Sequence, residues 1–313
     1  MPDEFIPENL CRHSIYERRS LVETADFARL SRPGCSVDDF IASLPDILAG
    51  RDFKTLLSRL RKIRDAGGPI VMAMGAHVIK CGLSPVVIDL IRRGIITAVA
   101  TNGAGAVHDW EVAFAGATSE DVAVELPAGR FGMTRETAVA LAESAARARR
   151  EGAGLGETIG REIVEQELHH RAYSILAAAV ECDIPVTVHV AVGTDVVHMH
   201  PEADGADVGA ATMTDFRKIC SVVSTLAAGA WVNVGSAVIL PEIFLKAVAA
   251  ARNIGVDLDN MFTANLDMFD LYRPRTNVVN RPCAQGITII GRHEILMPLL
   301  RLGLVGGLGE QSA

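Results

Sequence analysis

Six short apolar runs divide this chain, and a longer segment with helical periodicity separates most of them from the next. The runs are rich in Val, Ile and Met and are apolar on both faces, as a sheet between two helix layers requires. Because strands that alternate with helices form βαβ units, the pattern predicts an α/β fold with a doubly wound, mainly parallel six-stranded sheet. The predicted strands are Pro69–Met74, Ile95–Ala100, Pro185–Val192, Trp231–Gly235, Asn260–Ala264 and Gly286–Gly291.

The segment from Glu157 to Val180 predicts one long amphipathic helix that carries His169 and His170. Residues 1–66 contain no clear strand, so we expect a helical N-terminal extension that packs on the main domain. Residues 67–313 are the predicted α/β unit, and the chain is then one structural domain overall. The other main helical segments begin at Ser84, Thr134, Gly209 and Leu240.

Charge and cysteine usage exclude several classes of protein. The chain of 313 residues has a formal net charge of −8 and no block of basic residues, so neither nucleic acid nor a membrane surface is expected as a partner. No apolar stretch is long enough to span a bilayer, and the acidic start "MPDEFIPENL" lacks the cationic region of a signal peptide. Six scattered cysteines without a C-x-x-C pair indicate reduced, buried thiols and a cytoplasmic protein.

The segments that follow the predicted strands are where chemistry is expected, because ligands of open parallel sheets bind beyond the carboxyl ends of the strands. One of them, "TNGAGAVHDWE", places Gly103, Ala104, Gly105 and Ala106 directly after a strand. Such small residues let backbone N–H groups approach a pyrophosphate, or they serve only tight packing between helix and strand. The spacing is not G-x-G-x-x-G, so a standard dinucleotide fingerprint is absent.

The segment "GTDVVHMHPEADGAD" contains His198 and His200 in an H-x-H pattern, with Asp195 before them. Alternate residues of an extended segment face the same way, so both imidazoles could meet one metal ion. This pattern suggests a metal-dependent hydrolase as an alternative function. The other interpretation is a polar loop that lines an organic substrate pocket.

Two further segments carry candidate binding groups. "LYRPRTNVVNRP" supplies Arg273 and Arg275, whose guanidinium forks suit a carboxylate or a phosphate, although exposed loop arginines are common. Lys80 follows the first strand, where it is either a reactive amine or a solvated side chain.

Taken together and in order, these segments resemble the deoxyhypusine synthase family. The similar stretches are "MGAHVIKCGLSPVVIDLIRRGIITAVATNGAGAVHDWE", "VGTDVVHMH", "NVGSAVILPE", "FTANLD" and "IIGRHEILMPLL", and the likeness covers roughly residues 20–300. The resemblance implies a doubly wound NAD-binding fold and a homotetramer with sites at subunit interfaces. Known members oxidise spermidine with NAD and move its aminobutyl group, held as an imine on an enzyme lysine, to a lysine of a translation factor.

Residues that match the cofactor half of this family are retained or conservatively placed. The resemblance implies that His77 stands where the family has Asn in its first turn, and that Asp195 matches the Asp of a Thr-Asp turn. It likewise assigns a small-residue turn, the start of a glycine run and a Thr-Ala turn to NAD. The implied positions are Ala104, Gly105, Gly235, Thr263 and Ala264.

The half of the family's site that performs the chemistry is altered. Its paired glutamates are replaced by His108 and Asp109, one of its aspartates by His200, and the histidine after its glycine run by Pro241. The catalytic lysine expected before the last strand is missing, since residues 265–291 contain no Lys. We therefore expect that this protein does not make deoxyhypusine.

These observations predict an NAD-binding enzyme that oxidises a small amine or amino-acid-like metabolite by hydride transfer, with or without group transfer. The predicted catalytic residues are His108, Asp109 and His200, because imidazole and carboxyl groups can serve as general bases. A non-catalytic NAD-binding protein is a further alternative. We expect no resident metal in the leading interpretation and a homo-oligomer, most simply a tetramer. The predicted substrate-binding residues are Glu111, His198, Glu242, Arg273 and Arg275.

Overall fold

The computed structural model describes residues 5–306 and confirms the predicted α/β fold. All six predicted runs contribute strands, and each neighbouring pair is parallel. The strand order is β3-β2-β1-β4-β5-β6, so the winding direction reverses between β1 and β4. The strands are β1 (Ile70–Met74), β2 (Ala98–Asn102), β3 (Val186–His189), β4 (Ala230–Val234), β5 (Phe262–Asp267) and β6 (Ile287–Ile290).

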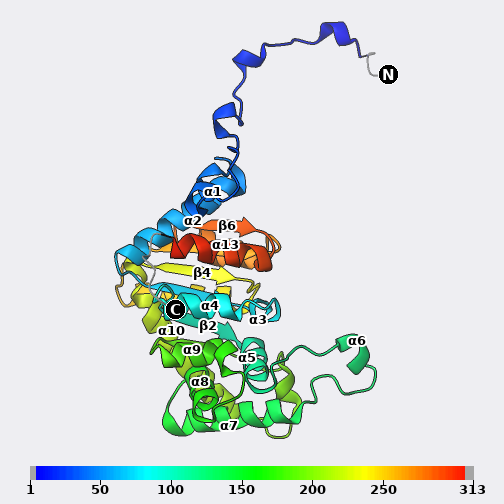
Figure 1. Ribbon diagram of the computed structural model, residues 1–313, viewed down its shortest axis with the longest axis vertical. Helices are drawn as coiled ribbons and strands as arrows, with labels where there is room; N and C mark the ends of the chain where they lie inside the picture. Colours follow the sequence, from blue (N-terminus) through cyan, green and yellow to red (C-terminus); the bar gives the residue numbers. More distant parts are fainter. Residues whose placement is uncertain (1–4, 307–313) are drawn as a thin grey trace.

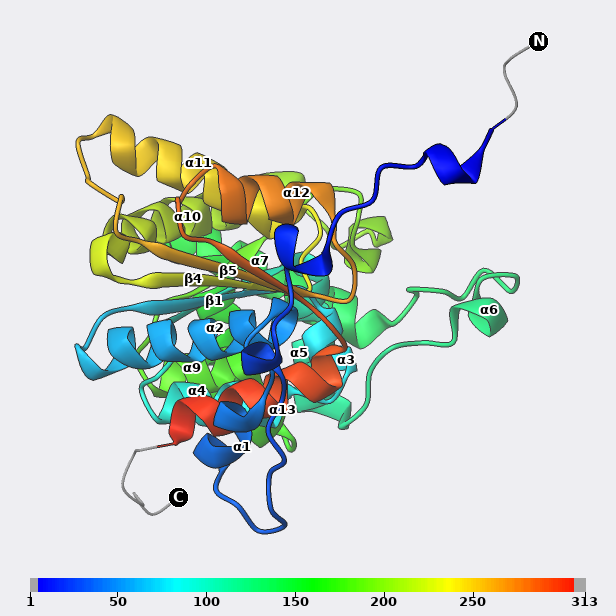
Figure 2. The same ribbon diagram turned by 90° about the horizontal axis from the view of Figure 1, so that it is seen from above.

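Two layers of helices enclose the sheet, with α10 and α11 on one face and α2, α4, α9 and α13 on the other (Figures 1 and 2). Successive side chains of β1 alternate between the two layers, and all of them are buried. The helices are α1 (Val37–Ser43), α2 (Leu48–Asp65), α3 (His77–Lys80), α4 (Ser84–Arg92), α5 (Gly103–Ala115), α6 (Val122–Glu125), α7 (Arg135–Glu151), α8 (Leu155–Glu165), α9 (Ile175–Glu181), α10 (Gly205–Ser224), α11 (Ile239–Asn253), α12 (Tyr272–Pro274) and α13 (His293–Val305).

The long helix predicted over residues 157–180 is wrong, because the structure contains two helices there, α8 and α9. The chain turns at Glu167, which has a φ of +51°, and α9 starts anew at Ser174, whose hydroxyl accepts the N–H of Ala177. His169 and His170 lie in the turn between these helices rather than on a helix face. The N–H of His170 donates to the carbonyl of Ala113 at 2.9 Å, which ties this turn to α5.

The N-terminal part of the chain divides into two portions. Helix α2 packs on the sheet through Phe53, Leu56 and Leu60, which are buried. Residues 5–35 instead project from the body as an extended segment with short 3₁₀ turns, unlike the packed extension that we expected (Figures 1 and 2). No hydrophobic side chain of this segment is buried.

All six cysteines are free, but only Cys283 is buried, whereas Cys11 and Cys35 are exposed. The expectation of buried thiols therefore fails at the N-terminal segment. Among the helices within residues 5–306, none combines the length and the apolar character needed to cross a membrane.

Candidate functional site

Two glycines pack against each other at the carboxyl edge of the sheet where the strand order reverses, and we call this part of the edge the crevice. A Cβ atom on Gly75, after β1, would lie 2.2 Å from the carbonyl oxygen of Gly235, after β4. Gly235 has a φ of +61°, and a Cβ there would lie 2.7 Å from Nε2 of His293. Only glycine fits this approach of two backbones. In open α/β sheets the crevice at such a reversal is the place where dinucleotides bind.

Two histidines and an aspartate surround these glycines. The rings of His77 and His293 meet edge to face, with centroids 5.8 Å apart. His293 is 1% exposed, and its Nδ1 has no hydrogen-bond partner among residues 5–306. Burial lowers the pKa of His293, although the nearby carboxylate of Asp267, at the end of β5, acts in the opposite direction. The crevice therefore contains a buried imidazole with a free nitrogen.

Polar side chains on β4 and β5 lie beneath the same crevice. Asn233 Nδ2 donates to Oδ1 of Asn265 at 2.8 Å and to the carbonyl of Ser236 at 3.0 Å. The remaining amide atoms, Asn233 Oδ1 and Asn265 Nδ2, find no partner within the described chain, and both residues are fully buried. Buried polar atoms that lack partners are costly, so they indicate an absent water or ligand.

The predicted Thr-Ala turn is wrong. Thr263 and Ala264 lie inside β5, which continues to Asp267, and both are fully buried. The strand extends further than expected because Asn265 is accommodated in the sheet by its bond to Asn233. The residue of β5 that reaches the carboxyl edge is thus Asp267. Neither Asp267 nor His293 was predicted as a site residue. Asp267 ends the apolar run of β5, and His293 follows that of β6.

Helix α11 begins just after Gly235. The N–H of Leu240 donates to Ser236 Oγ at 3.2 Å, but the N-cap residue Val238 supplies no side-chain hydrogen bond. Glu242, in the first turn, is bound to Lys246, to Asn277 Nδ2 at 2.8 Å and to Arg273 at 3.3 Å. The hydrogen bond from Lys246 is the main reason that the pKa of Glu242 lies below its usual value.

Arg275 does not join this group, since its guanidinium pairs with Asp270 at 2.6 Å. Arg273 and Arg275 are both about half exposed. They lie in α12 and in the π-helical turn that follows it, η7 (Arg275–Asn280). The structure therefore places the two arginines on the β4–β5 side of the edge.

A polar cavity of about 170 Å³ lies beyond the carboxyl ends of β2 and β3. Helix α5 contributes His108 and Glu111, which are one turn apart on the same face. Lys80 reaches the cavity from α3. Asp195 lines it from the loop after β3, and Glu120 from the loop before α6. Of the ionisable residues predicted for the site, this cavity contains His108, Glu111 and Asp195.

His108 and Glu111 are joined through a threonine. Thr118 donates its hydroxyl proton to Glu111, so Nδ1 of His108, 2.6 Å from Thr118 Oγ1, must be the donor in that contact. The neutral His108 ring then has its free lone pair on Nε2. Burial raises the pKa of Glu111, but the adjacent His108 and the hydrogen bonds from Thr118 and Thr137 outweigh it and leave the pKa below its usual value. The cavity thus contains an anion, Glu111, next to a base, His108.

At the start of α5, side chains of the protein itself occupy the space beside the small residues. A Cβ on Gly103 would lie 1.9 Å from Asp195 Oδ2, and a Cβ on Gly105 would lie 2.1 Å from Thr101 Oγ1. The N–H of Gly105 donates to the side chain of Asn102 at 2.9 Å. The space beside Gly105 is thus occupied by Thr101, whereas Ala104 lines the polar cavity.

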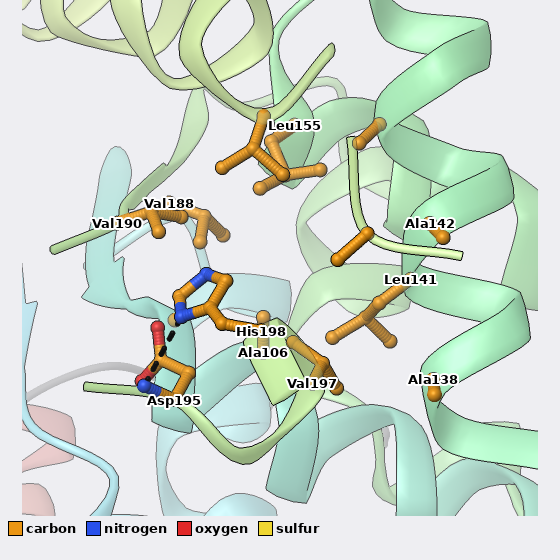
Figure 3. Close-up of a pocket in the computed structure, with 14 residues that line it drawn as sticks. Ala106, Ala138, Leu141, Ala142, Leu155, Val188, Val190, Asp195, Val197 and His198 are labelled. Atoms are coloured by element: carbon orange, nitrogen blue, oxygen red, sulfur yellow. Dashed lines mark hydrogen bonds between the residues drawn. The ribbon is translucent and has the colours of Figure 1, made fainter. Parts of the chain in front are cut away.

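A second, mainly apolar cavity of about 30 Å³ lies next to the first, between α5, α7 and β3 (Figure 3). Asp195 belongs to the lining of both cavities. Its side chain is 8% exposed, and burial raises its pKa, although His198 partly offsets this. His198 points into the apolar cavity, and its Nδ1 accepts the N–H groups of Gly193 at 3.2 Å and Asp195 at 3.3 Å.

The metal-hydrolase alternative is not supported by this geometry. His198 Nδ1 is used by its own loop, and Nε2 of His200 is 2.7 Å from the carbonyl oxygen of Gly132. Within residues 5–306, no three His, Cys, Asp or Glu side chains are placed to hold one ion. His200 lines neither cavity, so the structure does not bring it together with His108.

Asp109 is a structural residue, and its predicted catalytic role is wrong. It is 1% exposed and points away from the cavity, toward the start of α9. Its carboxylate accepts the hydroxyl of Ser174 at 2.5 Å and the N–H groups of Ile175 at 2.8 Å and Leu176 at 3.2 Å. Burial raises the pKa of Asp109 to about 6, against the lowering effect of these hydrogen bonds.

The fold and the edge geometry define a Rossmann-type α/β domain. Residues 54–203, just under half of the chain, match the family described as "Arginine dihydrolase ArgZ-like, C-terminal, Rossmann fold". Comparison with curated proteins gave no match.

Solved structures share the fold at low identity. A putative LOR/SDH protein of Methanococcus maripaludis S2 is 17% identical, with a TM-score of 0.53 over 94% of this chain and 75% of its own. The ternary complex of AgrE with ornithine and NAD+ is 17% identical, with a TM-score of 0.52 over 86% of this chain and 34% of its own.

A putative deoxyhypusine synthase from Entamoeba histolytica is 10% identical, with a TM-score of 0.53 over 88% of this chain and 94% of its own. The chain spans only about a third of the length of the AgrE structure and of ArgZ, a cyanobacterial arginine dihydrolase. The expected likeness to deoxyhypusine synthases is thus confirmed at the level of the fold, which ArgZ and AgrE share.

Proposed function

We propose that this protein is an NAD-binding enzyme that oxidises a small amino acid carrying a second amine. The observation that carries the proposal is that two glycines meet where the strand order reverses, and that a cavity lined by three carboxylates lies along the same edge of the sheet. The crevice suits a dinucleotide, and the cavity suits a cationic substrate.

The crevice residues fit NAD in three respects. Gly75 and Gly235 leave no side chain between the backbones after β1 and β4. Helix α11 begins a few residues after Gly235, and a helix N-terminus favours a phosphate, although Ser236 Oγ already accepts the N–H of Leu240. His293 Nδ1, buried beside these glycines, has no partner in the described part of the chain. These residues would hold the cofactor, and bound NAD would supply the hydride acceptor.

The cavity residues would bind and deprotonate the substrate. Glu111, held as an anion, attracts an ammonium group. His108 can take a proton on Nε2, and Glu111 at 3.7 Å stabilises the imidazolium that results. Lys80 places a cation on the same lining and would pair with a substrate carboxylate. A diamino acid satisfies both signs of charge.

The comparisons support this substrate class. AgrE, whose fold this chain shares, has been solved with ornithine and NAD+, and ornithine is an amino acid with a second amine. The likeness to deoxyhypusine synthases points the same way, because their substrate is a polyamine oxidised by NAD. The scattered free cysteines favour a cytoplasmic setting.

The test has two stages. Calorimetry with NAD should give saturable binding, and failure of NAD to bind would contradict the proposal. The protein with NAD should then form NADH with ornithine or lysine but not with alanine, which lacks the second amine. Binding without turnover of any diamino acid would favour the non-catalytic alternative.

A further inference from the structure

The chain between α5 and α7 forms a loop, residues 118–133, that carries α6 and stands away from the body (Figures 1 and 2). We call this loop the flap. Its outer part has a defined shape, since Asp121 caps α6 and Arg130 pairs with Glu125 at 2.6 Å. Its inner part lines the polar cavity with Ser119, Glu120, Val122 and Phe131. The flap is therefore one wall of the candidate site.

The second end of the flap is held by the loop after β3. His200 Nε2 lies 2.7 Å from the carbonyl oxygen of Gly132, and because a carbonyl only accepts, Nε2 carries the proton. A Cβ on Gly132 would lie 2.8 Å from Val196, so this end of the flap packs directly on the 3₁₀ turn η5 (Val196–Met199). His200 thus fixes the position of Gly132.

Glu120 is the ionisable residue that the flap brings to the cavity. Both of its carboxylate oxygens share the N–H of Gly132, at 3.1 Å each. Arg130 of the flap pairs with Glu125 instead, and no ion pair within residues 5–306 involves Glu120. Because an ionised carboxylate has about four acceptor positions, Glu120 can still accept hydrogen bonds from a cation.

A second observation indicates that the cavity takes a cation. Asp195, which lines it, is 8% exposed, and its Oδ2 has no hydrogen-bond partner within residues 5–306. The lining holds three carboxylates, those of Glu111, Glu120 and Asp195, against one ammonium, that of Lys80. An ammonium group of a ligand would balance this charge and make charge-assisted hydrogen bonds, which are the strong ones.

We propose that Glu120 recognises the second amine of the substrate, and that His200 is the positioning residue that holds Glu120 at the cavity through Gly132. This inference rests on the proposed function, in which His108 and Glu111 serve the amine that is oxidised. The second amine of a diamino acid then needs an anion of its own, and Glu120 supplies it. His200 acts from outside the cavity, because it binds the carbonyl of the residue whose N–H binds Glu120.

Calorimetry on the full chain with NAD tests the role of Glu120. Norvaline has the carbon chain of ornithine without the second amine, so the wild type should bind ornithine more tightly than norvaline. Glu120→Gln should lower the ornithine affinity by about 10- to 100-fold, as loss of a hydrogen bond between charged groups does, and leave the norvaline affinity unchanged. Its amide oxygen can still accept the N–H of Gly132. Glu125→Gln, on the same flap but outside the cavity lining, is the matched control.

The outcomes separate this inference from the proposed function. An unchanged preference for ornithine in Glu120→Gln, or no preference in the wild type, would overturn the inference even if NADH forms. A preference that depends on Glu120 without any NADH would support the inference and contradict the oxidation.

Two variants of His200 test its positioning role. His200→Leu removes the hydrogen bond to Gly132 and should lower the ornithine affinity as Glu120→Gln does, whereas His200→Gln keeps an N–H donor and should restore it. Combined with Glu120→Gln, His200→Leu should cause no further loss, because both changes act on one contact. Thermal unfolding and the affinity for NAD should stay as in the wild type. Additive losses, or no rescue by glutamine, would overturn the assignment of His200.

Discussion

The two candidate binding regions at the carboxyl edge of the sheet differ in the polar groups that they contain. In the crevice between β1 and β4, His293 Nδ1 and Asn233 Oδ1 have no partners within residues 5–306, and the backbones touch through glycines. In the cavity beyond β2 and β3, Glu111 is fully hydrogen-bonded and His108 is fixed in one tautomer. Asp195 Oδ2 in this cavity also lacks a partner within residues 5–306, so the difference is that the first region holds a buried imidazole and two amides, whereas the second holds a base beside an anion.

The largest effect should come from His108. His108→Gln keeps a polar side chain but removes the base, so we expect turnover of the diamino acid to fall by roughly 10²–10⁴-fold. The affinity for NAD should not change, because His108 lies outside the crevice. His169→Gln, in the exposed turn after α8, is the matched control. Equal turnover in both variants would show that the cavity is not the reacting site.

The next largest effect should be on the pH dependence of stability, where variants of Asp109 and Glu111 on α5 should differ. Asp109 has a pKa of about 6 in the folded protein and an ordinary value of 3.8, so the folded state holds its proton more tightly. Its contribution to stability is therefore full below about pH 4 and is lost as the pH rises toward 6. Asp109→Asn should remove this pH-dependent change in the free energy of unfolding, which is up to about 3 kcal/mol between pH 4 and 6. Denaturant unfolding at several pH values measures it.

Glu111→Gln should change the pH dependence of stability in the opposite direction to Asp109→Asn. The pKa of Glu111 is lowered, so its contribution is present near neutral pH and is lost on acidification below its usual value. If both variants changed the pH dependence in the same direction, the distinction between the structural acid and the site acid would fail.

Gly235→Ala tests the crevice. The new Cβ would meet His293 at 2.7 Å, so we expect NAD affinity to fall about tenfold, or about 1.4 kcal/mol. Gly255→Ala is the control, because Gly255 also has a positive φ, of +89°, but no neighbour within 4 Å. The control should lose stability without losing affinity. Equal NAD affinity in the two variants would mean that the cofactor does not bind here.

The smallest expected effect concerns group transfer. With NAD, labelled spermidine and a translation-factor acceptor, we expect no label on the acceptor, since residues 265–291 lack a lysine to hold the fragment. Lys80 is the lysine that lines the cavity. Label that appears with the wild type and disappears with Lys80→Ala would show that this lysine has taken over the role.

The fold could be predicted because periodicity reports burial, which a single sequence displays. The six strands followed from apolar runs, and errors arose where polar residues are buried in pairs, as in β5 with Asn265 and Asn233. The site was harder to predict because a carboxylate after a strand does not reveal its partner. Asp109 binds the Ser174 hydroxyl, 65 residues away in sequence, and the first N–H groups of α9, while Glu111 on the same helix faces the cavity.

Asp195 stands in the wall between the polar and the apolar cavity, and this links their occupants thermodynamically. An apolar group that enters the smaller cavity removes water from the carboxylate and favours its protonated form. A cation in the larger cavity favours the ionised form. By thermodynamic reciprocity, a ligand in either cavity then lowers the affinity of the other cavity for its ligand by the same factor. The coupling acts through the protonation of Asp195.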